Sequence, residues 1–277
     1  MHTLCLSCKD QVGIVASVSS CLRDNGCNIE ESSQFNEPSS NQFYMRVVLS
    51  YEDKSAYAKF SNCFEDIAKD YKMKWQLSSC EKKTKTVLMV SKHDHCLHDL
   101  LYRVSTGSLP IEVTDVISNH ETTKPLVESY NIPFHYQPMV DKEQQEEAVQ
   151  SIIDNSEADL IVMARYMQIL SEDFIEKYHG KVINIHHSFL PGFKGARPYH
   201  QAYERGVKII GATAHFATKD LDEGPIITQK VVPVDHSYTP EKMQSLGRDT
   251  ESLALAKAIS LYAEQRVFIH NNKTIIL

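Results

Sequence analysis

Residues 182–192 read Val-Ile-Asn-Ile-His-His-Ser-Phe-Leu-Pro-Gly, an apolar strand that runs directly into polar residues and a Pro-Gly loop. A continuous apolar run is typical of a strand buried on both faces of a parallel sheet, and such sheets bind ligands at the carboxyl ends of their strands. Asn184 and His186 are two residues apart, so on an extended strand both side chains point to the same face. His187 then points to the opposite face, and we interpret it as structural.

Other apolar strands, separated by helical segments, are predicted before and after this one. Leu160 to Ala164 is another fully apolar run bounded by polar residues. Further strands are predicted at 87–90, 112–117, 134–136 and 209–216, and helical patterns at 96–104 and 144–155. This alternation predicts a Rossmann-like α/β domain with a mostly parallel sheet and helices on both of its faces.

The strand predicted at 209–216 runs into an acidic loop that ends in Gly-Pro at residue 225. The composition of this loop does not choose among its carboxylates. For Asp220 and Glu223, a solvated position in a turn is the simpler interpretation. A histidine at the end of a strand is likewise more often structural than catalytic.

The first eighty residues predict a ferredoxin-like βαββαβ unit. Its strands are expected at 3–8, 28–35, 42–51 and 73–77, and its second helix at 56–71. The first helix begins at Gly13 and ends at Asn25-Gly26, since glycine tolerates the left-handed conformation found at helix ends. The charged stretch 81–85 has no apolar face and is interpreted as a linker between domains at 1–80 and 86–277.

The composition restricts the possible partners. The formal charge of -7 argues against a nucleic acid or an anionic membrane as the main partner, because phosphate binding needs a basic surface. No apolar run reaches the ~20 residues of a membrane span. The seven cysteines lack paired ligand spacings, so we expect free thiols, no metal site and a cytoplasmic location.

Taken together, the Asn-Ile-His and Phe-Leu-Pro motifs of the first stretch, followed by Leu-Asp-Glu-Gly-Pro at 221–225, resemble the folate-dependent formyltransferase superfamily. The resemblance covers roughly residues 85–277. It implies that Asn184, His186 and Asp222 are catalytic, and that no cofactor is needed because a small folate is the substrate. It also implies a folate-binding set of Met167, Gln168, Ile169, Leu170, His215, Thr218 and Asp220. Without the resemblance, Arg165 to Leu170 predicts only the start of a helix that packs Met167 and Leu170 into the core.

The N-terminal unit resembles an ACT domain, with residues 10–14 fitting the strand-to-helix turn of that family. The resemblance implies homo-oligomers and a small effector, such as an amino acid, near Asp10, Gly13, Asn25 and Gly26. A unit that serves only in oligomerisation is the alternative. The fusion, with His95 to Leu101 and Gly195 to Tyr203, resembles the hydrolytic members of the superfamily.

The stretch Val90 to Leu97 indicates which molecule accepts the formyl group. Transferases that act on a phosphorylated amine hold its phosphate with a glycine-rich loop at this position, whereas this stretch has no glycine and carries Asp94. We therefore expect water as the acceptor, so that 10-formyltetrahydrofolate yields formate for purine synthesis and one-carbon pools are balanced. A transferase for another small amine, or a non-enzymatic folate or amino-acid sensor, are the alternatives.

Overall fold

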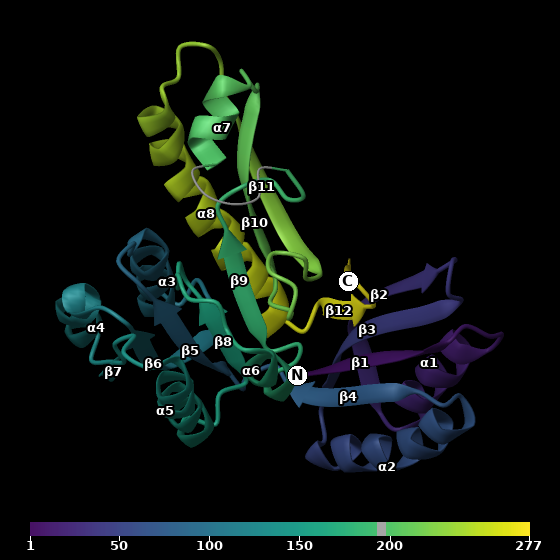
Figure 1. Cartoon of the computed structure of the whole chain (residues 1–277). Helices are drawn as coiled ribbons and strands as arrows, with labels where there is room; N and C mark the ends of the chain where they lie inside the picture. Colours follow the sequence, from purple (N-terminus) through teal and green to yellow (C-terminus); the bar gives the residue numbers. More distant parts are fainter. Residues whose placement is uncertain (193–197) are drawn as a thin grey trace. The chain divides into compact units, whose positions relative to one another are not determined.

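A computed structural model describes residues 1–192 and 198–277 of the chain (Figure 1). The chain forms two compact units. The first consists of Met1–Lys82, Glu264–Phe268 and Ile275–Leu277, and the second of Lys83–Ala263 and Ile269–Thr274. The predicted segment from Gly195 to Tyr203 begins outside the described residues.

The first unit has the predicted βαββαβ order. Its antiparallel sheet has the order β2-β3-β1-β4. The strands are β1 (His2–Lys9), β2 (Cys27–Glu37), β3 (Gln42–Tyr51) and β4 (Lys74–Ser79), and the helices are α1 (Ile14–Asp24) and α2 (Lys54–Asp70). Alternate residues of β1, among them Leu4 and Leu6, pack in one core with the apolar residues of both helices.

The last residues of the chain form a hairpin, from β12 (Val267–His270) and β13 (Lys273–Ile276). Part of this hairpin belongs to the first unit rather than to the predicted domain 86–277, because Phe268, Ile275 and Leu277 pack on Tyr44 of β3.

The second unit is built on a seven-stranded sheet of order β11-β10-β9-β8-β5-β6-β7. Its strands are β5 (Thr84–Val90), β6 (Ile111–Ser118), β7 (Phe134–Tyr136), β8 (Leu160–Met163), β9 (Val182–His186), β10 (Ile209–Phe216) and β11 (Ile226–Pro233). The five strands from β9 to β7 are parallel to one another, whereas β10 runs antiparallel to both of its neighbours, β9 and β11. This confirms the predicted mostly parallel α/β sheet. β5 begins inside the predicted linker because Thr84 already pairs with Ile111.

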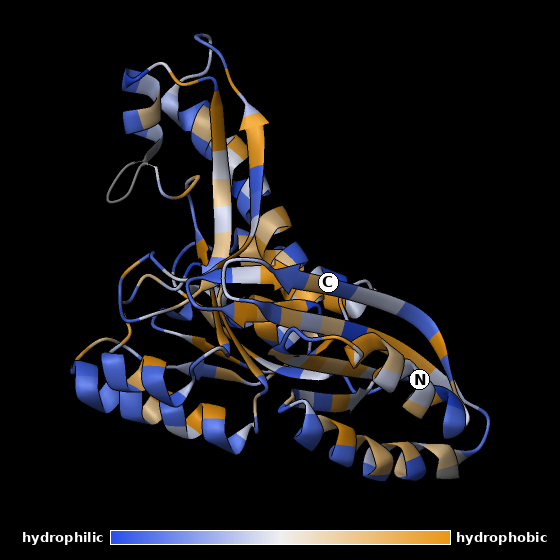
Figure 2. Ribbon diagram, turned by 90° about the vertical axis from the view of Figure 1, so that its right-hand side faces the viewer, coloured by the Kyte–Doolittle hydropathy of each residue, from blue (hydrophilic) through white to orange (hydrophobic). Residues whose placement is uncertain are grey.

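The helices of this unit are α3 (His95–Ser105), α4 (Lys124–Ser129), α5 (Lys142–Asn155), α6 (Glu172–Lys177), α7 (Pro198–Glu204) and α8 (Pro240–Ala263), with a short 3-10 turn at Glu121–Thr123. All four residues of β8 are buried, as its apolar composition predicts. Figure 2 shows the central strands of the sheet mainly in hydrophobic colours, whereas hydrophilic and hydrophobic residues are mixed along the helices. Among the described residues, no helix has the length and apolar character that crossing a membrane requires.

The strand order reverses between β5 and β8. From β5 the chain adds β6 and β7 on one side, then returns to place β8 and β9 on the other. In parallel α/β sheets, ligands bind outside the carboxyl ends of the strands at such a reversal. The segments that begin at Ser91 and Arg165 leave the sheet at this point.

Candidate active site

Two neighbouring strands bring the polar residues of separate sequence motifs together. β9 and β10 run antiparallel, with His215 opposite Asn184 and Thr213 opposite His186. Side chains at directly opposite positions share one face of a sheet. Asn184 Nδ2 accordingly lies 3.3 Å from His215 Nε2. The expectation that Asn184 and His186 share a face agrees with this arrangement.

The loop after β10 adds a carboxylate to this cluster. Asp222 Oδ2 lies 3.1 Å from His186 Nδ1, and its Oδ1 lies 3.7 Å from His215 Nε2. Asp220 and Glu223 are exposed, whereas the side chain of Asp222 is only 14% exposed. The tertiary structure therefore selects Asp222 among carboxylates that the loop composition leaves equivalent.

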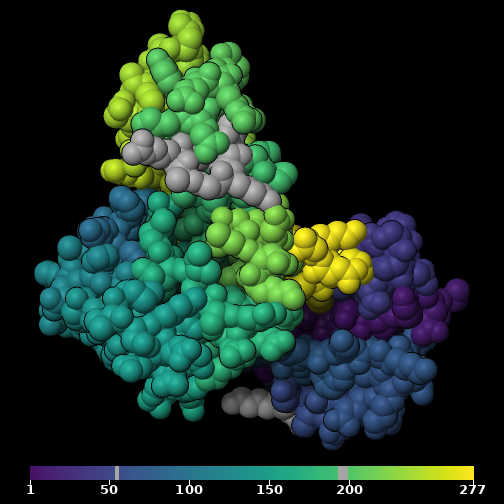
Figure 3. All heavy atoms as spheres, viewed as in Figure 1, coloured from purple at the N-terminus to yellow at the C-terminus, as the bar shows by residue number. Residues whose placement is uncertain are grey.

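The backbone of the loop is held tightly against β10. Asp222 has a φ of 57°, in the left-handed region that non-glycine residues seldom adopt. A Cβ on Gly224 would lie 1.8 Å from the carbonyl oxygen of Phe216, so only glycine allows this approach. The loop lies at the surface of the second unit (Figure 3).

Charges within the cluster are strongly coupled. Burial alone raises the pKa of Asp222, but hydrogen bonds and charge interactions with His186 and His215 outweigh burial and hold it below its ordinary value. Asp222 is therefore a carboxylate at neutral pH. The carbonyl of Phe216 can only accept a hydrogen bond, so His215 Nδ1, 2.9 Å away, carries a proton.

One atom of the cluster is left without a partner. His186 is buried, and its Nε2 makes no hydrogen bond with any described residue. A buried, unpaired imidazole nitrogen has a desolvation cost of about 1–3 kcal/mol, and such orphans are rare away from functional sites. Because Asp222 holds Nδ1, the free Nε2 is the atom available to a substrate.

Arg165 to Leu170 forms a loop rather than the start of a helix. Arg165 has a φ of 66°, which ends the extended path of β8. The buried hydroxyl of Ser91 accepts the backbone N–H of Met167 at 3.0 Å and donates to Asn119 Oδ1 at 2.7 Å. The segments that follow β5, β6 and β8 are thereby joined at the strand reversal.

The other predicted folate-binding residues have different environments. His215 lies in the central cluster, whereas Thr218 and Asp220 lie farther along the acidic loop, joined by a Thr218 hydroxyl bond to the Asp220 carbonyl. The side chains of Met167 and Ile169 are exposed, Gln168 is partly exposed, and Leu170 packs against the core.

The predicted effector residues do not form one site within a chain. Asp10 and Gly13 lie before α1, whereas Asn25 and Gly26 follow it. The helix has 11 residues and is therefore about 16 Å long, too long for one small molecule to contact both ends.

A buried network beside the cluster joins side chains whose contact the sequence does not indicate. Glu251 of α8 accepts a hydrogen bond from the Tyr199 hydroxyl at 3.1 Å and lies 2.9 Å from His95 Nε2. His95, Cys96 and Glu251 bring one ligand atom each within 4.8 Å of one another, a set that the cysteine spacing does not predict. The Arg165 guanidinium, 3.4 Å from Glu251, already compensates its charge and would repel a metal ion.

Comparisons with known proteins agree with this geometry. A profile of the family described as "Formyl transferase" matches residues 84–259. A formyltetrahydrofolate deformylase of Corynebacterium sp. (strain P-1) is 46% identical, covering 100% of this chain and 98% of that protein. A formyltetrahydrofolate deformylase of Bacillus subtilis (strain 168) is 43% identical, covering 99% of this chain and 92% of that protein. The crystal structure of a formyltetrahydrofolate deformylase from Burkholderia mallei ATCC 23344 matches with a TM-score of 0.95 and 43% identity, over 100% of this chain and 99% of that one. The chain belongs to the formyltetrahydrofolate deformylase family.

Proposed function

We propose that the protein hydrolyses 10-formyltetrahydrofolate to formate and tetrahydrofolate. The observation that carries this proposal is the unpartnered Nε2 of the buried His186, whose Nδ1 is held by Asp222. Such an arrangement fits a histidine that stabilises and moves charge on a substrate. It supports Asn184, His186 and Asp222 as the catalytic residues.

The reaction needs water attack, stabilisation of the oxyanion and protonation of the departing nitrogen. Asp222 orients and polarises the water, and its negative charge supports a cationic His186. His186 Nε2–H and the Asn184 amide N–H donate to the formyl oxygen as the C–O bond to water forms. A preorganised donor of this kind contributes about 10²- to 10³-fold in rate.

The tetrahedral intermediate then collapses. The bond between the formyl carbon and N10 breaks as His186 delivers its Nε2 proton to N10. One of the two protons of the attacking water then returns to His186 and restores its charge, and the other passes to solvent as the product leaves as formate. A positioned histidine contributes about 10²- to 10⁴-fold through such transfers. His215 positions the Asn184 amide, since its Nε2 lies 3.3 Å from Asn184 Nδ2.

Water as the acceptor is supported by the segment between β5 and α3. α3 begins after Asp94, which puts an acidic side chain at the helix N-terminus where a phosphate would bind. A phosphorylated amine therefore meets like charge at this position. The exposed apolar side chains of Met167, Ile169 and Leu221 support folate binding beside the cluster.

A single assay tests the proposal: purified protein and 10-formyltetrahydrofolate without any amine, with formate and tetrahydrofolate measured over time. We expect equal amounts of both products. We expect His186→Ala to abolish turnover while folate binding persists, and Asn184→Ala to keep weak activity. Formate release that requires an added amine would identify a transferase. Folate binding without turnover under any condition would identify a sensor.

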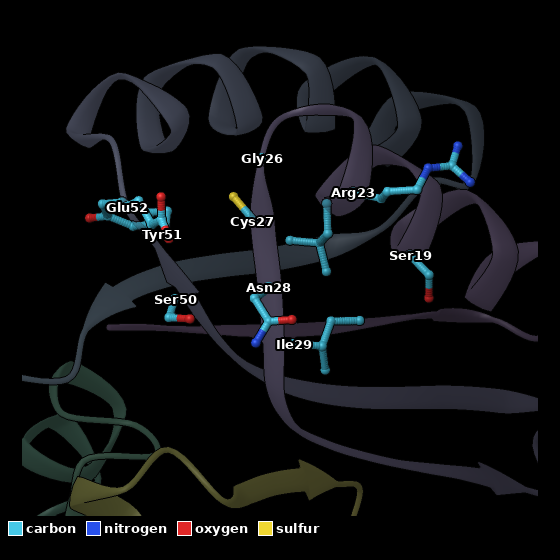
Figure 4. A pocket seen from close by; sticks show the side chains of 10 residues that line it. Ser19, Arg23, Gly26, Cys27, Asn28, Ile29, Ser50, Tyr51 and Glu52 are labelled. Carbon is cyan, nitrogen blue, oxygen red and sulfur yellow. The ribbon is translucent and has the colours of Figure 1, made fainter.

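The first unit supports a second proposal, that it pairs between copies of the chain and binds an amino-acid effector. A pocket of about 660 Å³ lies between the end of α1, the start of β2 and the end of β3 (Figure 4). Arg23 and Glu52 offer opposite charges there, as the carboxylate and ammonium of an amino acid require. β2 is an edge strand, which leaves one row of its backbone groups available to a second copy. A thermal-shift screen of amino acids, with light scattering for the subunit number, tests both parts.

The cysteines support a reducing compartment, the cytoplasm, as the place of action, because all seven are free thiols.

A further inference from the structure

His187, the residue after the proposed catalytic histidine, lines a separate cavity of about 200 Å³ in the second unit. The cavity is lined by two arginines, four histidines, a tyrosine, a glutamine and a single glutamate. The ring centroids of His186 and His187 are 5.0 Å apart, so the cavity adjoins the reaction centre. No step of the proposed hydrolysis uses this cavity.

The one carboxylate of the cavity is already engaged. Glu251 is buried, with its Oε1 bonded to the Tyr199 hydroxyl and its Oε2 to His95. Its charge is compensated by Arg165, at 3.4 Å. Tyr199 reaches Glu251 only because residue 247 is glycine, where a Cβ would lie 1.9 Å from the hydroxyl. Glu251 therefore holds the neighbouring side chains of the cavity in place, and both of its oxygens already have partners, so it is poorly suited to bind a cationic ligand.

Arg165 also fixes the orientation of His187. Its NH1 donates to His187 Nδ1 at 2.7 Å, so the imidazole is neutral and carries its proton on Nε2. Burial first, and then the positive charge of Arg165, lowers the pKa of His187 to about 4. His187 thus contributes an N–H donor but no charge at neutral pH.

The remaining charge of the cavity is positive. Arg248, from α8, lines it, and none of the ion pairs among residues 1–192 and 198–277 includes this arginine. Burial and the neighbouring Arg165 lower the pKa of His93, so that this imidazole is also uncharged at neutral pH. Among the described residues that line the cavity, Arg165 and Glu251 offset each other, and Arg248 leaves about one uncompensated positive charge.

We propose that this cavity binds formate, the carboxylate product of the proposed reaction, with Arg248 as its principal partner. The inference rests on the proposed function for the identity of the anion. A net charge near +1 matches a monoanion better than a dianion such as phosphate. The ring of His187 lies 5.0 Å from that of His186, so an anion held in the cavity places negative charge close to the oxyanion of the next turnover and slows it.

The size of the ligand limits its affinity. Formate has three non-hydrogen atoms, and the best small ligands obtain a bounded free energy per atom, which sets a dissociation constant no lower than about 0.5 mM. Inhibition by formate at millimolar concentrations is therefore the expected functional consequence.

The test is a titration of the full chain with ¹³C-labelled formate, followed by NMR, in the absence of any folate. We expect saturable binding in the millimolar range and a roughly tenfold weaker affinity in Arg248→Gln, an exposed position where the change leaves folding intact. Lys257→Gln removes the same charge from an exposed position of the same helix, outside the cavity, and is expected to bind like the wild type.

Three outcomes would overturn the proposal: no saturable binding below about 50 mM, equal affinity in Arg248→Gln and wild type, or displacement of formate by equimolar inorganic phosphate. Formate inhibition of turnover should weaken in Arg248→Gln by the same factor as binding. Formate binding is measured without folate, so it does not depend on turnover. If the hydrolysis proposal failed, formate would still bind but the protein would release none from folate, and this result differs from a failure of the cavity proposal.

Discussion

The replacement Asp222→Asn tests the central electrostatic contact of the proposed mechanism. It keeps the size of the side chain and removes the charge that faces His186 Nδ1 at 3.1 Å. An asparagine can also present its NH₂ group to Nδ1, which favours the wrong imidazole tautomer. We expect kcat to fall and the KM for folate to change little, because the carboxylate acts mainly when His186 is charged.

The magnitude follows from the distance and the surroundings. Two unit charges 3.1 Å apart interact by about 5 kcal/mol at an effective dielectric constant of 20, and by only about 1.3 kcal/mol in bulk water. Because the Asp222 side chain is only 14% exposed, the first value applies. At 1.36 kcal/mol per factor of ten, the expected loss in kcat is between 10³- and 10⁴-fold.

The assay is formate release under saturating folate, with Asp220→Asn in the same loop as the matched control. Asp220 is exposed and forms no ion pair in the structure as described for residues 1–192 and 198–277. A part in folate binding would change KM, so the kcat of its variant under saturating folate should stay within about twofold of wild type. A fall in the kcat of Asp222→Asn of tenfold or less would mean that solvent screens the contact between Asp222 and His186, and it would refute the reasoning. So would a larger loss in Asp220→Asn than in Asp222→Asn.

Three further replacements test the supporting structure. Gly224→Ala puts a Cβ 1.8 Å from the Phe216 carbonyl, so thermal unfolding should show about 1–3 kcal/mol of destabilisation together with lost activity; unchanged unfolding would contradict the close packing. Ser91→Ala leaves the Met167 N–H unpaired, and the KM for folate should rise about tenfold with kcat preserved; an unaltered KM in steady-state kinetics would rule out this support. The pKa of His187 is lowered from 6.5 to about 4, so its contribution to stability is present above pH 6.5 and is lost as the pH falls toward 4. Between those pH values the free energy of unfolding, measured with denaturant, should therefore fall by about 2 kcal/mol less in His187→Gln than in wild type. Identical pH profiles of the two proteins would disprove this.

The fold was largely accessible from local sequence patterns. The fully apolar run at 160–164 contains a strand whose side chains are buried on both faces of the sheet. A strand buried in this way needs apolar residues at every position, and that pattern is visible in the sequence itself. The segment Arg165 to Leu170 was harder, since its apolar residues suit a helix equally well. A left-handed Arg165 and the Ser91 hydroxyl decide its path, and both act through partners that are distant in sequence.

The sequence by itself determined that Asn184 and His186 share a face, because strand periodicity is a local property of the backbone. It also determined the absence of a glycine-rich loop after β5. Only the tertiary structure decided which carboxylate joins them, because Asp222 reaches His186 through a left-handed backbone and a glycine packed on Phe216. The same holds for Glu251, whose partners His95, Arg165 and Tyr199 come from three separate segments. Hydrogen bonds and ion pairs depend on distances in space, and a linear sequence does not encode those until the sheet is assembled.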